Sequence, residues 1–169
     1  MKQLFMAVLV VLTYILQTTL MPEITVFDVH PDLCLIVVCS IAFLFGSTSG
    51  GVIGFFLGLM IDLYYGRSIG INALVLLYIG IFLGSFNKKV FKDNYLVILI
   101  FMIFTTFFYE SVLYFYIAFV YSQNLDIWMF LNNTTTLIIL NIILGFFVYP
   151  ILLKINLGLE IDRNIFSKR

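Results

Sequence analysis

Charged residues are scarce in this sequence. Only 11% of its 169 residues are Asp, Glu, Lys or Arg, whereas about a quarter of the residues in a typical soluble domain are charged. Nine basic and nine acidic residues leave no net charge, which excludes the basic surface that a nucleic-acid-binding protein needs. Hydrophobic residues make up 63% of the chain. This composition is typical of an integral membrane protein.

Histidine and cysteine, which often carry chemistry, are also rare. The single histidine, His30, alternates with Asp28 and Asp32 beside a proline; such a loop fixes no coordination geometry, so we expect no metal site. Cys34 and Cys39 would point away from each other on a helix, and we expect free, buried thiols. The sequence has no phosphate-binding Gly-Lys motif and no zinc-binding helix. We therefore predict a protein without a cofactor that is not an enzyme.

Long apolar segments occupy most of the chain. A membrane-spanning helix needs about 20 apolar residues, and the pattern predicts helices at 4–21, 33–48, 50–65, 69–86, 95–121 and 132–154. Glycines and serines at 46–51 separate the second helix from the third, and this short pair forms either thin spans or a re-entrant pair buried in protein. Pro150 is expected to kink or end the last helix. The prediction is an all-α fold, a single integral membrane domain over residues 1–169 with six transmembrane helices.

The basic residues are distributed unevenly along this pattern. With six helices and both termini in the cytoplasm, Arg67 is the only basic residue in an outer loop. Basic residues near the ends of spans resist translocation, so this arrangement is the expected one. The residues assigned to the cytoplasmic side are Lys2, Lys88, Lys89, Lys92, Lys154, Arg163, Lys168 and Arg169.

Four glycines, Gly46, Gly50, Gly54 and Gly58, recur at intervals of four residues. On a helix each is rotated by only about 40° from the one before, so together they form one slowly turning groove. Small residues allow the close backbone approach on which helix association in lipid depends. The groove therefore serves packing within this chain, a ligand, or the transmembrane helix of a partner protein, and we single out the four glycines as candidate partner-helix contacts.

The segment around Ser49 resembles the serine motif of rhomboid intramembrane proteases, with Ser47 in place of the leading glycine. A serine nucleophile needs a base within about 3 Å. The predicted topology places His30, the only histidine, on the opposite side of the bilayer. We therefore predict that the chain is not such a protease.

Among the polar residues within predicted spans we single out three, Asp62, Glu110 and Asn141. Asp62 can reach the membrane interface, pair with Arg67, or cap the next helix near Asn72. Glu110 and Asn141 are predicted at similar depth, where a hydrogen bond between them would satisfy both side chains. Contact of Glu110 with a partner's polar group or with a ligand is the alternative.

Taken together, these features resemble the MreD family of bacterial rod shape-determining proteins over nearly the whole chain. The likeness begins with Gln17, Pro22 and the segment Pro31-Asp32-Leu33. It is strongest in a glycine-rich stretch made of Gly46, Gly50-Gly51, Gly54-Phe55, Gly58-Leu59, Asp62, Gly66 and Gly70.

The resemblance implies a non-enzymatic scaffold of the cell-elongation complex, which directs peptidoglycan synthesis and rod shape from the bacterial inner membrane. The partners it implies are an MreC-like bitopic membrane protein and, in the same complex, a RodA-like glycosyltransferase and a class B penicillin-binding protein. The family is also similar in fold to substrate-binding subunits of energy-coupling-factor vitamin transporters, so such a subunit is the alternative function. Against that alternative, Val11 replaces the second alanine of the Ala-x-x-x-Ala pattern that would begin at Ala7.

Overall fold

The computed structural model describes residues 2–65, 70–86, 95–121 and 126–166, and these residues form an all-helical fold. A short 3-10 turn, Met21–Glu23, follows the first helix. The predicted loop residues Arg67, Lys88, Lys89 and Lys92 lie outside the described residues, as do Lys168 and Arg169. The helices are α1 (Lys2–Thr19), α2 (Leu33–Phe45), α3 (Ser47–Tyr65), α4 (Ile71–Ser85), α5 (Tyr95–Tyr121) and α6 (Ile127–Phe166).

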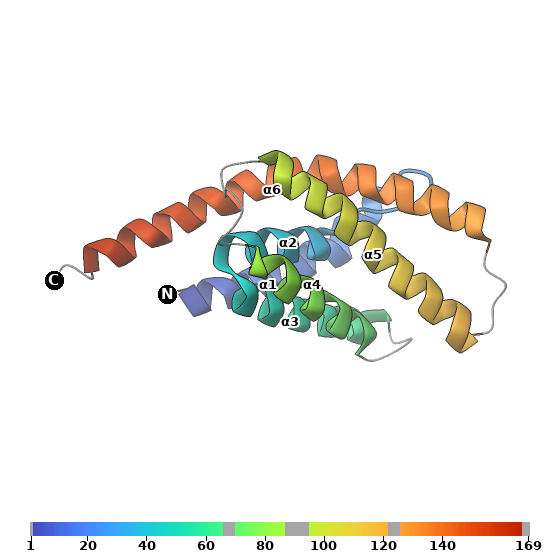
Figure 1. Cartoon of the computed structure of the whole chain (residues 1–169), viewed down its shortest axis with the longest axis horizontal. Helices are drawn as coiled ribbons and strands as arrows, with labels where there is room; N and C mark the ends of the chain where they lie inside the picture. The colour runs from blue at the N-terminus through green and yellow to red at the C-terminus, as the bar shows by residue number, and fades with distance from the viewer. Residues whose placement is uncertain (1, 66–69, 87–94, 122–125, 167–169) are drawn as a thin grey trace.

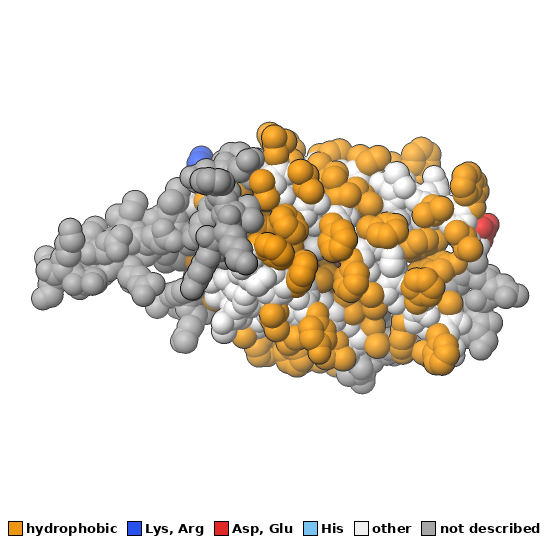
Figure 2. Space-filling model, in the orientation of Figure 1, with side chains coloured by type: hydrophobic (Ala, Val, Ile, Leu, Met, Phe, Trp, Pro, Cys, Tyr) orange, Lys and Arg blue, Asp and Glu red, His pale blue; other side chains and the backbone are white. Residues whose placement is uncertain are grey.

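Consecutive helices run in opposite directions, so that α1 begins and α6 ends at the same end of the molecule (Figure 1). The segments Phe5–Glu23, Ser47–Tyr64, Leu96–Val120 and Ile127–Ile155 are long and apolar enough to cross a membrane, whereas α2 and α4 are shorter apolar helices. Among the residues that Figure 2 colours, hydrophobic side chains cover most of the visible face, and charged atoms show only near the two ends of this coloured part. An apolar outer surface of this extent suits contact with lipid.

The helix α2 forms the centre of the bundle. All its residues from Leu33 to Leu44 are buried, and it contacts each of the other five helices. Nearly all side chains of α2 itself are apolar, on every face of the helix. This is the pattern expected for a helix enclosed by protein. The side chain of Asp32 caps its start by accepting a hydrogen bond from the Leu35 N–H at 2.9 Å.

The turn between α2 and α3 is tighter than predicted. We predicted that the second helix ends at 48 and the third begins at 50, but α2 ends at Phe45 and α3 begins at Ser47. Gly46 alone makes the turn, with a φ of +89° that residues with a side chain rarely adopt. The predicted break is therefore present, and one glycine is sufficient for it.

The last helix is longer than predicted at both ends. It begins before residue 132 because Asp126 caps it, accepting a hydrogen bond from the Trp128 N–H at 2.9 Å. It also continues through Pro150, so of the two predicted effects of this proline, a kink or an end, it does not end the helix. A proline removes one backbone hydrogen bond and bends a helix, and α6 is bent in Figure 1.

The helices α3 and α4 are in backbone contact. A Cβ added to Gly54 would collide with the carbonyl group of Leu76, and one added to Gly58 would lie 2.5 Å from the Ala73 Cα. Because these two glycines have no side chain, the backbone of α4 can approach the backbone of α3. This close approach maximises dispersion contacts, on which helix association in lipid depends.

We predict that Gly54→Ala lowers the free energy of unfolding by about 1–3 kcal/mol, because the backbone of α4 has to move to admit the methyl group. The matched control is Gly51→Ala, whose new methyl would meet the side chain of Ile81 rather than backbone. Equilibrium unfolding in detergent micelles measures the free energy of unfolding of both variants. Equal losses for the two variants would contradict backbone contact at Gly54.

Candidate functional site

Asp62 holds the beginning of α4. It is buried, and its two carboxylate oxygens accept hydrogen bonds from the backbone N–H groups of Gly70, Asn72 and Ala73 and from the Asn72 side-chain amide, at 2.9–3.2 Å. The first N–H groups of a helix have no partner within the helix, and a negative charge there is favourable. Of the three roles predicted for Asp62, capping of α4 is therefore confirmed, whereas pairing with Arg67 stays a prediction because Arg67 lies outside the described residues.

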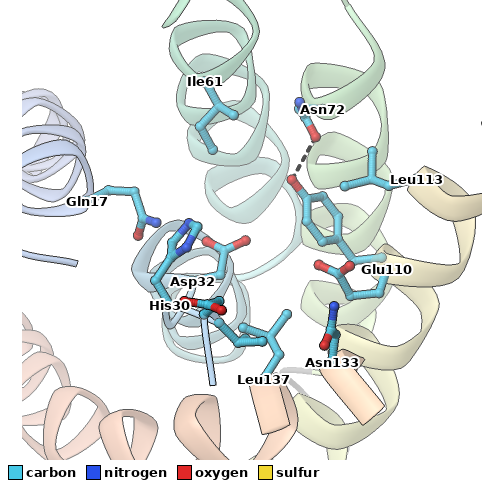
Figure 3. A pocket seen from close by; sticks show the side chains of 12 residues that line it. Gln17, His30, Asp32, Ile61, Asn72, Glu110, Leu113, Asn133 and Leu137 are labelled. Carbon is cyan, nitrogen blue, oxygen red and sulfur yellow. Dashed lines mark hydrogen bonds between the residues drawn. The ribbon is translucent and has the colours of Figure 1, made fainter. Parts of the chain in front are cut away.

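Asn72 extends this network to α5. The hydroxyl of Tyr109 donates a hydrogen bond to the Asn72 Oδ1 at 2.7 Å (Figure 3), and Tyr109 is buried. A chain of hydrogen bonds from Asp62 thus joins α3, α4 and α5. Sequence analysis missed Tyr109, because a tyrosine in an apolar helix gives no signal that its hydroxyl has a partner 37 residues away in the preceding helix.

The predicted hydrogen bond between Glu110 and Asn141 is wrong. The Asn141 Oδ1 accepts the backbone N–H of Asp32 at 2.9 Å, and its Nδ2 donates to the Thr106 Oγ1 at 3.2 Å. Because α6 begins at Ile127 and not at 132, Asn141 lies about 7.5 Å further along the bundle than predicted. It therefore reaches Thr106, one helical turn before Glu110.

Gln17 of α1 also holds the segment before α2, which Asn141 of α6 contacts at Asp32. Its Nε2 donates to the Pro31 carbonyl at 3.3 Å, and its Oε1 accepts the Leu33 N–H at 2.7 Å. Together with Asn141, this amide holds the start of α2 between α1 and α6. Gln17 and the segment Pro31-Asp32-Leu33, which contributed to the family resemblance, therefore form one structural unit.

A cavity of about 320 Å³ opens beside this unit. All helices except α2 contribute residues to its lining, together with the loop before α2. In Figure 3, Glu110 of α5 and Asn133 of α6 lie across the cavity from His30 and Asp32. The predicted alternative role of Glu110, contact with a ligand or a partner's polar group, stays a prediction, and Glu110 lines this cavity.

The charge of the cavity lining is mainly negative. Asp28, Asp32 and Glu110 contribute carboxylates, and His30 is the only basic side chain among the described residues of the lining. Burial raises the pKa of Asp32 above its ordinary value, although the hydrogen bond from the Leu35 N–H opposes this rise. In the described part of the chain, no three His, Cys, Asp or Glu side chains are arranged to hold a metal ion.

The glycine ladder lies mainly inside the molecule. Gly54 and Gly58 face α4, and a Cβ on Gly50 would lie 2.6 Å from the Ala42 Cβ of α2 and 2.8 Å from the carbonyl oxygen of Gly80 in α4. Of the roles weighed for these three glycines, packing within the chain is the one present, because α2 and α4 occupy the space that a partner's helix would need. Gly46 instead forms the turn before α3.

The two cysteines also lie inside the molecule. Cys34 and Cys39 are free and buried, as predicted. The sulfur of Cys39 lies 3.3 Å from the Thr105 hydroxyl, at hydrogen-bond distance. These thiols therefore belong to the packed interior of the bundle around α2, and they do not line the cavity.

We predict that Asp62→Ala lowers the free energy of unfolding by at least about 2 kcal/mol, because it leaves several buried N–H groups of α4 without an acceptor. Asp126→Ala is the matched control; it removes one exposed cap, and about 1 kcal/mol is expected. Unfolding of both variants in the same micelles gives the comparison. A loss for Asp62→Ala no larger than that for Asp126→Ala would show that the network does not stabilise the bundle.

The part of the chain that forms the polar network and the cavity also matches a known protein family. The family model described as rod shape-determining protein MreD matches residues 1–156, a range that includes every residue of the polar network and the cavity lining. No curated protein and no solved structure matches the chain. On the match over nearly its whole length, the chain belongs to the MreD family of rod shape-determining membrane proteins.

Proposed function

We propose that this protein is a non-enzymatic scaffold of the bacterial cell-elongation complex, acting through helix–helix contacts with partner membrane proteins. It would reside in the inner membrane with six spans and both termini in the cytoplasm. The family match over residues 1–156 carries this proposal, because that family is defined by rod shape determination. The partners proposed are an MreC-like bitopic protein and, in the same complex, a RodA-like glycosyltransferase and a class B penicillin-binding protein.

The positions of the two residues that could form a serine–histidine pair support a non-enzymatic role. Ser49 lies in the first turn of α3, whereas His30 precedes α2. The length of α2, about 20 Å, therefore separates them, and a general base must come within about 3 Å of the proton it removes. The vitamin-transporter alternative gains no support from the comparisons.

A groove on the lipid-facing surface offers a place for a partner's helix. It lies between α1 and α3, has a volume of about 550 Å³ and is lined wholly by apolar side chains. From Val52 to Leu63 it extends about 16 Å, or three helical turns. The residues that line it include Ala7, Val10, Val11, Val52, Phe56 and Leu63.

The occupant we propose is the single transmembrane helix of the MreC-like protein. In lipid, helices associate where small residues and complementary surfaces allow close contact. On the α1 side of the groove, the small side chain of Ala7 leaves room for such a contact. Several side chains of the groove are about half exposed, including Val11 (48%) and Val52 (50%). We assign to this groove the partner-contact role that the sequence predicted for Gly46, Gly50, Gly54 and Gly58. Gly46 forms a turn, and the close contacts of the other three lie within the chain.

We predict that Ala7→Phe reduces co-purification of the MreC-like protein several-fold, because the ring would fill the groove. Val8→Phe is the matched control: Val8 is the next residue of α1, is 57% exposed and does not line the groove. Affinity purification from membranes, with unfolding temperatures to show that both variants fold, makes the comparison. Unchanged recovery with Ala7→Phe would mean that lipid, and not the partner's helix, occupies the groove.

A further inference from the structure

The cavity beside the start of α2 is built from rigid parts. Gln17 and Asn141 hold the segment that carries Asp32, and the bond between Asn72 and Tyr109 fixes the turn of α5 that carries Glu110. Side chains held in place by their neighbours lose little freedom when a ligand arrives. The Asp32 carboxylate and the helix turn that carries Glu110 are therefore fixed on opposite sides of one space (Figure 3).

The hydrogen-bond donors around the cavity are largely committed elsewhere. The Gln17 amide is bonded to Pro31 and Leu33, and the Tyr109 hydroxyl donates to Asn72. Glu110 makes no hydrogen bond or ion pair with any other residue in the described ranges, although its side chain is partly buried. A partly buried carboxylate without a partner is costly, and a positive group beside it removes much of that cost.

The balance of charge gives the sign of the missing group. The lining has three carboxylates, Asp28, Asp32 and Glu110, and among its described residues there is no lysine or arginine. His30 lies near Asp32, but one imidazole can balance only one of the three carboxylates. An anionic ligand would be repelled, and a purely apolar one would leave Glu110 unpaired.

We infer that this cavity binds a cationic group that carries N–H donors, an ammonium or a guanidinium. Its volume of about 320 Å³ lies at the lower end of the range for small-ligand pockets, which suits one basic side chain or a small amine. Charge-assisted hydrogen bonds to Glu110 and Asp32 would hold the group, and Asn133 lies beside Glu110 on the same side of the cavity. The source is either a diffusible cation or a lysine or arginine side chain of a partner protein.

The test uses n-butylguanidine and n-butylurea, which have the same shape but differ in charge, with the full chain in lipid nanodiscs and ligand-observed NMR. We expect saturable binding of n-butylguanidine, about tenfold tighter than that of n-butylurea. Glu110→Gln should remove this preference, while Glu23→Gln, an exposed glutamate outside the cavity, should keep it. Equal affinities for the two probes, or an unchanged preference in Glu110→Gln, would overturn the inference.

A second measurement distinguishes the two sources. If a partner's basic side chain occupies the cavity, Glu110→Gln also lowers recovery of the MreC-like protein; if the cation is diffusible, recovery is unchanged. The probe experiment contains no partner, so its result does not depend on the proposed scaffold function. Unfolding temperatures of Glu110→Gln confirm that the variant folds.

Discussion

Complete burial of α2 is the constraint on which the rest of this architecture depends. A helix of 13 residues is about 20 Å long, too short to cross the apolar layer of a bilayer unaided. Its terminal backbone groups must therefore find partners in protein. Asp32 and Gly46 supply the two ends, while Gln17 and Asn141 tie the first of them to α1 and α6.

The glycines of α3 serve the same requirement. Because Gly54 and Gly58 let α4 approach at backbone distance, the α3–α4 pair is thin enough for both helices to pack against α2. Asp62, near the end of α3, caps the start of α4 and so joins the two helices where the chain passes from one to the other. Dispersion contacts and saturated hydrogen bonds thus stabilise a core that the hydrophobic effect cannot stabilise in lipid.

Local sequence patterns predicted much of this fold. The apolar segments located all six helices, and α5 has the predicted bounds, 95–121. The cap on α4 could also be predicted, because Asp62 and Asn72 are close in sequence and one connection joins their helices. Gly46 was recognisable as a break, since glycine among serines interrupts an apolar run.

The long-range pairings could not be predicted in the same way. The partner of Asn141 depends on where α6 begins, and the exposed cap Asp126 moved that start by one and a half turns. The spacing of Gly50, Gly54 and Gly58 predicted close packing but did not identify the helix that packs there. The cavity arises from five helices and one loop, so only the tertiary structure reveals that Glu110 faces Asp32.

Two surfaces of the molecule follow from this arrangement, and they suit different contacts. The groove between α1 and α3 is apolar, and in the proposed membrane placement it would face lipid, where a helix or an acyl chain can lie. The acidic cavity lies at the end of the bundle where α1 gives way to α2, within reach of water-soluble groups. A scaffold that joins a membrane helix to a polar segment outside the bilayer would use both.

The orientation of the bundle decides whether that polar end faces the cell exterior, and cysteine labelling measures it most directly. Cys34 and Cys39 are buried, so a cysteine introduced at Asp28 or at Lys89, which lies outside the described residues, can be followed without removing them. With a membrane-impermeant maleimide, we predict labelling of Asp28→Cys in intact spheroplasts, and of Lys89→Cys only after permeabilisation. Labelling of Lys89→Cys from the medium would contradict the six-span scaffold with cytoplasmic termini.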